Sequence, residues 1–192
     1  MLLHKLHRYG IRGIPYHWFA SYLKNRHQYV SVGSKTSTIK PLNIGVPQGS
    51  ILGPILFLLF INDLPSCTEN LRTTLFADDT TLSIANENYN DLVPLINSEL
   101  SLVQGWIEKN RLTVNIEKTE LMIISNKDTN HNNNQIIFNN VSLKFTECSM
   151  FLGLKLDNKL KYVEQINHIS GKLLGILAYS QKYALTSQKK HV

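Results

Sequence analysis

Two adjacent carboxylates between two strand-forming runs constrain this chain more than any other feature. Asp78 and Asp79 stand between residues 71–77 and 80–84, which are predicted to form two short strands around an acidic turn. Neighbouring residues of a strand point to opposite faces, but a tight turn can bring both carboxylates to one edge. Like charges held so close repel each other unless a cation neutralises them. The pair therefore predicts either a Mg²⁺ site for phosphoryl chemistry or a solvated turn, since Asp-Asp pairs are common.

A second constraint lies upstream, where three glycines and two prolines punctuate residues 45–54. This loop leads into an apolar run, residues 54–62, which predicts a fully buried helix. Glycine allows a ligand to approach the backbone closely, and Gln48 and Ser50 supply hydrogen-bonding groups. The loop fits a ligand-binding segment or a rigid structural turn. It is not a P-loop, because no Gly-Lys-Ser/Thr follows at the required spacing.

Hydrophobic periodicity predicts the remaining elements, and their mixture of hairpins and helices indicates the α+β class. A turn at Asn139-Asn140 is expected to join two strands. Helices are predicted over residues 15–24, 91–109 and 163–176, strands over 28–32, 36–42, 120–125, 136–138, 141–145 and 150–156, and a polar loop over 128–135.

Charge is unevenly distributed along the 192 residues, whose formal net charge is +6. Residues 1–62 carry seven Lys or Arg and no Asp or Glu, residues 63–150 carry a net charge of −6, and residues 151–192 carry +5. This distribution is compatible with a chain whose two basic segments bind a polyanion while its acidic middle segment binds cations. Charge also varies by chance along any chain, so nucleic-acid binding stays a hypothesis at this point.

Composition excludes several classes of protein. Apolar residues make up 43% of the chain, enough for a core and too many for wholesale disorder. The longest apolar run, residues 55–61, is far shorter than the roughly 20 residues that span a bilayer. Cys67 and Cys148 offer neither a disulfide framework nor a metal-binding pair. An intracellular setting without a membrane partner is expected.

Three motifs follow one another along the chain: Gly45-Val-Pro-Gln-Gly-Ser-Ile-Leu-Gly-Pro-Ile-Leu-Phe57, Ile61-Asn-Asp-Leu-Pro65 and Phe76-Ala-Asp-Asp79. In order and spacing they resemble the reverse transcriptase of non-LTR (LINE-type, Jockey-like) retrotransposons. Residues 9–14, 18–23, 110–119 and 151–157 fit the family as well, so the resemblance covers nearly the whole chain. The joint match makes a chance Asp-Asp turn the weaker interpretation.

The resemblance implies a right-handed polymerase palm with an antiparallel sheet and packed helices. Residues 1–157 would form partial fingers and palm, and residues 158–192 the helical start of a thumb. The implied activity is RNA-directed DNA synthesis by a two-metal mechanism, with Mg²⁺ or Mn²⁺, an RNA template, a DNA primer and deoxynucleoside triphosphates. The location would be nuclear in a functional element.

The resemblance also implies roles for particular residues, and for some of them a purely structural interpretation is equally open. Lys118 fits an exposed loop lysine equally well, and residues 151–153 fit a plain core strand. The implied sites are Asp78 and Asp79 at the metals, Pro47, Gln48, Gly49 and Ser50 at the template and nucleotide, Lys118 near the nucleotide phosphates as a catalytic group, and Phe151, Leu152 and Gly153 in the primer grip.

One family feature is missing from the sequence. The family's further metal-binding aspartate, in a Phe-Asp motif, is expected N-terminal to residues 2–6, yet no acidic residue precedes Asp63. Asp63 itself is expected at a helix end or turn. We therefore expect an N-terminally truncated fragment whose polymerase activity alone is lost or impaired. Two other hypotheses stay open: a nucleic-acid-binding remnant without chemistry, and an unrelated metal-dependent phosphotransferase or nuclease.

Overall fold

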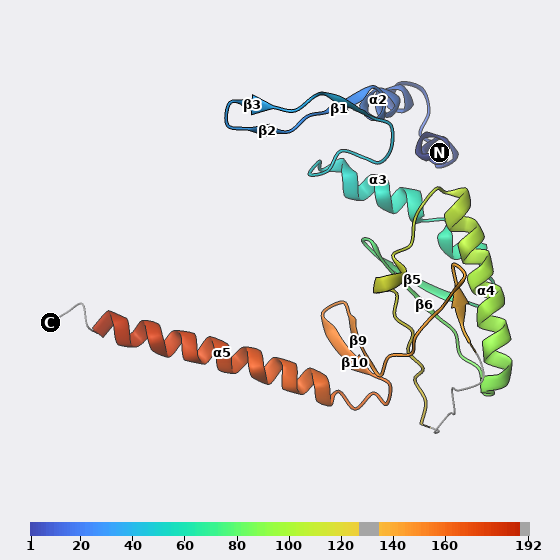
Figure 1. Cartoon of the computed structure of the whole chain (residues 1–192). Helices are drawn as coiled ribbons and strands as arrows, with labels where there is room; N and C mark the ends of the chain where they lie inside the picture. The colour runs from blue at the N-terminus through green and yellow to red at the C-terminus, as the bar shows by residue number, and fades with distance from the viewer. Residues whose placement is uncertain (127–134, 189–192) are drawn as a thin grey trace. The chain divides into compact units, whose positions relative to one another are not determined.

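A computed structural model describes residues 1–126 and 135–188 of the chain. It divides into two compact units, of which unit 1 comprises Met1–Glu87 and Ser98–Thr113, and unit 2 comprises Asn88–Asn97 and Val114–Val192 (Figure 1). The long helix α4 (Tyr89–Lys109) contributes its first part to unit 2 and its second part to unit 1. The predicted amphipathic helix over 91–109 is thereby confirmed.

Unit 1 combines helices with antiparallel hairpins. The predicted helix over 15–24 is confirmed as α2, which begins two residues earlier than predicted. The elements of unit 1 are α1 (Leu2–Arg8), α2 (Gly13–Leu23), β1 (Arg26–Gln28), β2 (Ser31–Val32), β3 (Lys35–Thr36), β4 (Lys40–Leu42), α3 (Leu52–Ile61), the 3-10 helix η1 (Leu64–Cys67), β5 (Arg72–Phe76) and β6 (Asp79–Ser83).

Strands β1 to β4 form one long, interrupted hairpin, as the two predicted strands over 28–42 imply. β1 pairs with β4, placing Arg26 opposite Leu42, and β2 pairs with β3 further along. Between the two paired parts, Val30 and Ser37 keep the strands together, because Val30 N–H donates to Ser37 Oγ at 2.9 Å. Gly33, at φ +59°, supplies the left-handed backbone of the connecting turn.

The apolar helix α3 is only partly buried, so the prediction of a fully buried helix over 54–62 is wrong. Leu56 and Ile61 are buried, whereas Ile55 is 50% exposed and Leu58 is 46% exposed. A helix that is apolar on every side needs neighbours on every side. The described residues of unit 1 cover only one of its faces, mainly with α1.

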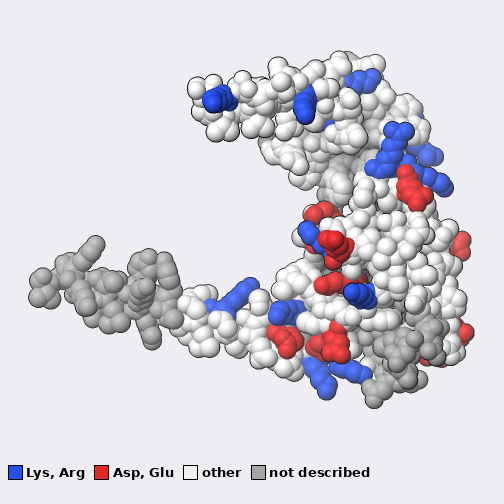
Figure 2. Space-filling view, in the orientation of Figure 1, with Lys and Arg blue, Asp and Glu red and all other residues white. Residues whose placement is uncertain are grey.

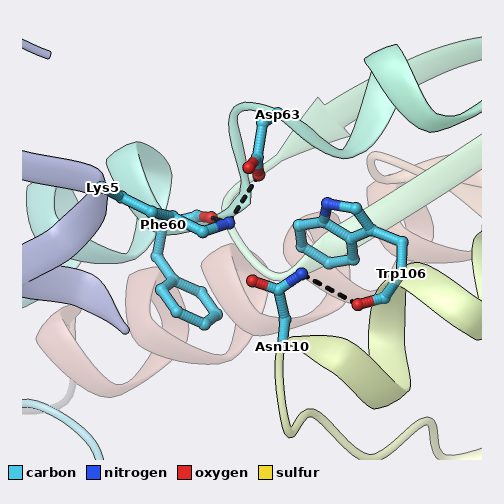
Figure 3. Close-up of polar contacts among 5 residues, drawn as sticks. All are labelled: Lys5, Phe60, Asp63, Trp106 and Asn110. Carbon is cyan, nitrogen blue, oxygen red and sulfur yellow. Dashed lines mark hydrogen bonds and ion pairs between the residues drawn. The ribbon is translucent and has the colours of Figure 1, made fainter. Parts of the chain in front are cut away.

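A buried lysine joins α1 to the end of α3 (Figure 3). The side chain of Lys5, 11% exposed, donates from Nζ to Asp63 Oδ1 at 2.6 Å and to the carbonyl oxygen of Phe60 at 2.7 Å. Its ammonium also lies 4.6 Å from the ring centroid of Phe60 and 4.7 Å from that of Trp106. The core around this cluster consists of Leu6, Leu56, Ile61, Leu64, Leu71, Leu100 and Val103.

Unit 2 contains the C-terminal half of the sequence. The predicted last helix is confirmed and extends to residue 188. The polar loop predicted over 128–135 lies almost entirely outside the described residues. The elements of unit 2 are the first part of α4, the 3-10 helix η2 (Ile116–Lys118), β7 (Ile137–Phe138), β8 (Val141–Ser142), β9 (Cys148–Phe151), β10 (Leu154–Asp157) and α5 (Val163–Gln188).

Two strand predictions in unit 2 are corrected by the structure. Residues 120–125 do not form a strand; they are extended and make a single parallel bridge, between Leu121 and Phe145. Residues 150–156 are not one strand but parts of the antiparallel pair β9 and β10, which reverses at Leu152 and Gly153. Both turn residues have positive φ, +47° and +85°. Leucine is a poor former of such turns, so the apolar sequence conceals the reversal.

The class α+β is confirmed, with strands that pair only two by two in residues 1–126 and 135–188. The predicted turn at Asn139-Asn140 is present between β7 and β8, with φ of +51° and +61°. β7 is anchored to α4, because Asn97 Oδ1 accepts from the Ile137 N–H at 2.8 Å. Across the described residues, no helix is both long enough and apolar enough to cross a membrane.

The contacts of Lys5 with Phe60, Asp63 and Trp106 are expected to stabilise unit 1. Replacing Lys5 with Met keeps most of the side-chain volume but leaves the Phe60 carbonyl and Asp63 without their charged donor. We expect Lys5→Met to lower the free energy of unfolding by about 2 kcal/mol, the scale of hydrogen bonds to charged groups. Urea denaturation measures this loss.

The matched control is Lys35→Met, at an exposed position of β3, with an expected change within about 0.5 kcal/mol. Equal midpoints for the two variants would contradict a structural role of Lys5.

Candidate functional site

The hairpin β5–β6 carries Asp78 in its turn and Asp79 as the first residue of β6, so the predicted hairpin is present and its turn lies one residue earlier than predicted. Phe76 pairs with Asp79, so Ala77 and Asp78 are the two central residues of the connection. Ala77 has φ +50°, the left-handed conformation that two-residue hairpin turns of this kind require. For an alanine that conformation costs about 1–2 kcal/mol. Strained backbone conformations are common at functional sites, so the strained Ala77 makes this turn a candidate site.

Both carboxylates are exposed, and within the described residues neither forms a hydrogen bond or an ion pair. They are therefore free to bind a cation. Hard oxygen donors suit Mg²⁺ and Mn²⁺, and Mg²⁺ is often bound by one or two carboxylates together with substrate phosphates. Among the residues that the structure describes, no group of three or more His, Cys, Asp or Glu gathers at one point. The turn thus fits a divalent cation that the substrate helps to hold.

A buried glutamate fixes the segment that leads into β5. Glu99, 4% exposed on α4, accepts hydrogen bonds from the Glu69 N–H at 3.2 Å and from Asn70 Nδ2 at 2.7 Å. Burial raises the pKa of the nearby Cys67 thiol, and the charges of Glu99 and Asp63 raise it further. The thiol is therefore protonated at neutral pH, and cysteine-based catalysis finds no support here.

The loop over residues 45–50 is held by its own hydrogen bonds. Ser50 Oγ donates to the Pro47 carbonyl at 2.7 Å and accepts from the Gly53 N–H at 3.0 Å, as a capping serine does at the start of a helix. Gly45 and Gly49 take positive φ, +77° and +76°, which the turns require. The hydroxyl of Ser50 is thus engaged in holding the loop against α3.

Gln48 is exposed and lines a cavity of about 400 Å³ at the base of the long hairpin. Pro47 lines the same cavity, and Arg26 and Gln28 face it from β1. Between this loop and either Asp78 or Asp79, no hydrogen bond or ion pair occurs in the described part of the chain. The expected adjacency of the loop and the acidic turn therefore remains a prediction.

The other predicted site residues belong to unit 2. Lys118 is exposed in η2, where its backbone N–H donates to the side chain of Asn115 at 3.3 Å. Phe151 is half-buried at the end of β9, while Leu152 and Gly153 form the turn of the β9–β10 hairpin. Lys118 and residues 151–153 therefore all lie in unit 2, whereas Asp78, Asp79 and the loop over residues 45–50 lie in unit 1.

Asp157, which the sequence did not single out, anchors the β9–β10 hairpin to the start of α5. Its carboxylate accepts backbone hydrogen bonds from Lys161 at 2.9 Å, Tyr162 at 2.5 Å and Lys159 at 3.1 Å. The Lys161 hydrogen bond is the main cause that lowers the pKa of Asp157 below its ordinary value. An aspartate that follows an extended segment and precedes an amphipathic helix is the signal by which it could have been found.

A stacked aromatic pair, formed by an exposed tryptophan and a half-buried tyrosine, is a second feature that sequence reasoning missed. On α2, the rings of Trp18 and Tyr22 stack with centroids 5.4 Å apart and planes 7° apart, and Trp18 is 52% exposed. The available signal is the spacing of four residues, which places the two rings on one face of a helix. Exposed aromatic faces close to basic side chains are surfaces on which nucleic-acid bases stack.

The chain belongs to the reverse transcriptase (RNA-dependent DNA polymerase) family, whose model matches residues 1–170. It is 30% identical over 156 residues to the RNA-directed DNA polymerase from mobile element jockey of Drosophila melanogaster, a match that covers 78% of this chain and 17% of that protein. It is 28% identical over 149 residues to the probable RNA-directed DNA polymerase from transposon BS of the same species, covering 74% and 16%.

A third relative is the retrovirus-related Pol polyprotein from type-1 retrotransposable element R1 2 of Nasonia vitripennis, 26% identical over 135 residues, covering 67% of this chain and 33% of that protein. The chain thus spans a third or less of the length of these relatives. The resemblance to non-LTR, LINE-type reverse transcriptases is confirmed. No solved structure matches the chain significantly.

The lowered pKa of Asp157 predicts a pH dependence of unit 2. Because the pKa is lower in the folded state, the stabilisation is complete above the unfolded value, about 3.9, and is lost as pH falls through the folded value. We expect Asp157→Asn to be less stable than wild type at pH 6, and the difference to shrink as pH falls below about 3.9. Urea midpoints across this range, followed by the NMR signals of residues 159–162, test it.

A gap between the two proteins that stays constant with pH would contradict the assignment. Glu164→Gln, in the first turn of α5, is the control for removing a carboxylate from the same region.

Proposed function

We propose that residues 1–192 supply the metal-binding turn and the substrate-positioning loop of an RNA-directed DNA polymerase. The observation that carries the proposal is the strained turn of β5–β6, which exposes two unpartnered carboxylates in a chain of the reverse transcriptase family. In this proposal β5 and β6 belong to the palm, α2 and β1–β4 to the fingers, and residues 158–192 to the beginning of the thumb.

Each candidate residue has a chemical task in this proposal. Asp78 and Asp79 hold the divalent cation, which when bound neutralises the phosphates of the incoming deoxynucleoside triphosphate and orients the attacking oxygen of the primer. The Gln48 amide donates and accepts hydrogen bonds at the nucleotide and template. Lys118 offers an ammonium to the phosphates, and residues 151–153 support the primer end.

The charge and aromatic distribution support an RNA template and a DNA primer as partners. Over the β1–β4 hairpin, Figure 2 shows basic side chains and no acidic ones, in agreement with the absence of Asp and Glu from residues 1–62. Lysine and arginine neutralise phosphates, and the exposed Trp18 ring offers a base a stacking surface. Both contributions are independent of base sequence.

A second candidate is a nucleic-acid-binding domain without catalysis. The observation in its favour is that no third carboxylate joins Asp78 and Asp79 within the described residues. Both functions predict nucleic-acid binding, so binding alone cannot separate them. Metal-dependent primer extension on an RNA template separates them, because only the polymerase proposal requires it.

The polymerase proposal predicts that Asp78 is required for metal binding and synthesis. In Asp78→Asn the remaining carboxylate shares the turn with a neutral amide, so the cation loses charge neutralisation and a ligand. We expect Mn²⁺ affinity to fall at least about 10-fold, the scale seen when a metal's supporting groups are removed. Primer extension by any polypeptide that contains these residues should fall at least about 100-fold.

Glu87→Gln removes an exposed carboxylate that follows β6 and is the matched control. Unchanged Mn²⁺ affinity and synthesis in Asp78→Asn would refute the assignment. Loss of metal affinity in Asp78→Asn, together with no synthesis by a longer wild-type polypeptide that adds an upstream Phe-Asp segment to these residues, would favour the non-catalytic candidate.

The basic hairpin predicts strong salt dependence of binding. The logarithm of the affinity for an RNA–DNA duplex should fall linearly with the logarithm of salt concentration, because each neutralised phosphate releases counterions. We expect the double variant Lys35→Gln/Lys40→Gln to reduce the slope by about 2. Fluorescence anisotropy titrations between about 50 and 200 mM salt measure it. Thr38→Ala is the uncharged control from the same hairpin, and a slope that all three proteins share would rule out the hairpin as the contact.

A further inference from the structure

We infer that Arg26 is a positioning residue that holds the loop over residues 45–50 in its substrate-binding conformation. The inference rests on the proposed function for its consequence in substrate binding, while its structural part stands on the contacts of Arg26 alone. Nothing in the loop motif itself points to this arginine, which lies on β1, ahead of the loop in the sequence.

The side chain of Arg26 binds three backbone carbonyls from two segments. Its Nη2 donates to the Gly45 carbonyl at 2.6 Å and to the Ile44 carbonyl at 3.2 Å, and its Nε donates to the Leu23 carbonyl at 3.2 Å. Leu23 is the last residue of α2, and Gly45 is the first residue of the loop. The guanidinium therefore ties the end of a helix to the beginning of the loop.

The chemistry of the contact requires an arginine. A guanidinium carries five donors in a rigid planar fork, whereas a lysine ammonium is a point charge on a flexible stem. The carbonyls at a helix end carry partial negative charge, so a cation binds favourably there. No carboxylate competes for Arg26, because its described side-chain partners are all carbonyl oxygens.

The position of the contact links it to the cavity beside the loop. Arg26, Gln28 and Leu42 line that cavity from the hairpin, while residues 44–48 line it from the loop. The two hydrogen bonds to Ile44 and Gly45 connect these sides. They therefore set the distance between the hairpin and the loop, and with it the position from which Gln48 reaches a substrate.

The Ser50 hydrogen bonds hold the other end of the same loop. Ser50 binds the Pro47 carbonyl and the Gly53 N–H, which fixes the loop to the first turn of α3. Between these two anchors, Gln48 and Gly49 make no hydrogen bond to the rest of the described chain. Loss of the Arg26 anchor should therefore release the loop on its hairpin side while α3 stays in place.

The test compares Arg26→Lys with Lys24→Gln in the full 192-residue chain. Arg26→Lys keeps the charge and removes the fork. Lys24→Gln removes a charge two residues away, from an exposed side chain that makes no hydrogen bond among the described residues. Backbone ¹⁵N order parameters report the loop, and anisotropy titrations with an RNA–DNA duplex report substrate binding.

In Arg26→Lys we expect the order parameters of Gly45, Val46, Gln48 and Gly49 to fall from about 0.85 to below about 0.6, the change from rigid to flexible backbone. Those of β5 and β6 should not change, which shows that the variant is folded. Duplex affinity should fall about 5-fold with the salt slope unchanged. Lys24→Gln should leave the loop rigid, which shows that loss of a nearby positive charge alone does not loosen it.

Two results would overturn the inference. One is a loop in Arg26→Lys as rigid as in the wild type. The other is a loosened loop with unchanged duplex affinity, because Arg26 would then be structural only. A wild-type chain that does not bind the duplex would instead contradict the proposed function, and the order parameters would still decide whether Arg26 holds the loop.

Discussion

The ammonium of Lys5 is the contact on which unit 1 depends. It lies between α1 and the end of α3, pairs with Asp63, binds the Phe60 carbonyl and lies against two aromatic rings, one of them from α4. A charge that is 11% exposed is stable only when it is paired and hydrogen-bonded, and here both conditions are met. Asp63 directly precedes η1, and β5 begins at Arg72, so this contact lies shortly before the acidic hairpin in the chain. Glu99 completes the arrangement by holding residues 69 and 70.

The acidic turn of β5–β6 differs from the Lys5 contact, because its charges are unpaired in the described part of the chain. Its carboxylates lack partners among the described residues, and Ala77 adopts a backbone conformation that costs an alanine free energy. A turn selected for stability alone would place glycine or asparagine there. Charges that are paired at Lys5 and Asp63 but, among the described residues, unpaired at the turn support the proposed cation site. The loop over residues 45–50 is similar: Arg26 and Ser50 hold its two ends, whereas Gln48 and Gly49 between them make no hydrogen bond to the rest of the described chain.

Sequence reasoning succeeded where the physical signal is local. The acidic turn, the Asn139-Asn140 turn and the amphipathic helix α4 are each encoded within a few residues, and the family motifs are contiguous. It failed where the outcome depends on distant partners. Lys5 and Asp63 are 58 residues apart, and neither is unusual by itself. Ile55 and Leu58 are apolar like Leu56, and only the neighbours of α3 decide which of them are buried. The reversal at Leu152 and Gly153 was missed although glycine favours turns, because the apolar residues on both sides also fit one continuous strand.

The central claim is that the acidic turn and the loop over residues 45–50 form one cation-dependent site. Paramagnetic broadening by Mn²⁺ of backbone amide signals, recorded with a bound RNA–DNA primer–template, tests it directly. We expect the signals of Asp78, Asp79 and Thr80 to broaden together with those of Gly49 and Ser50, and both groups to stay sharp in the Asp78→Asn/Asp79→Asn double variant. Broadening confined to the turn, or broadening that persists in the double variant, would contradict it.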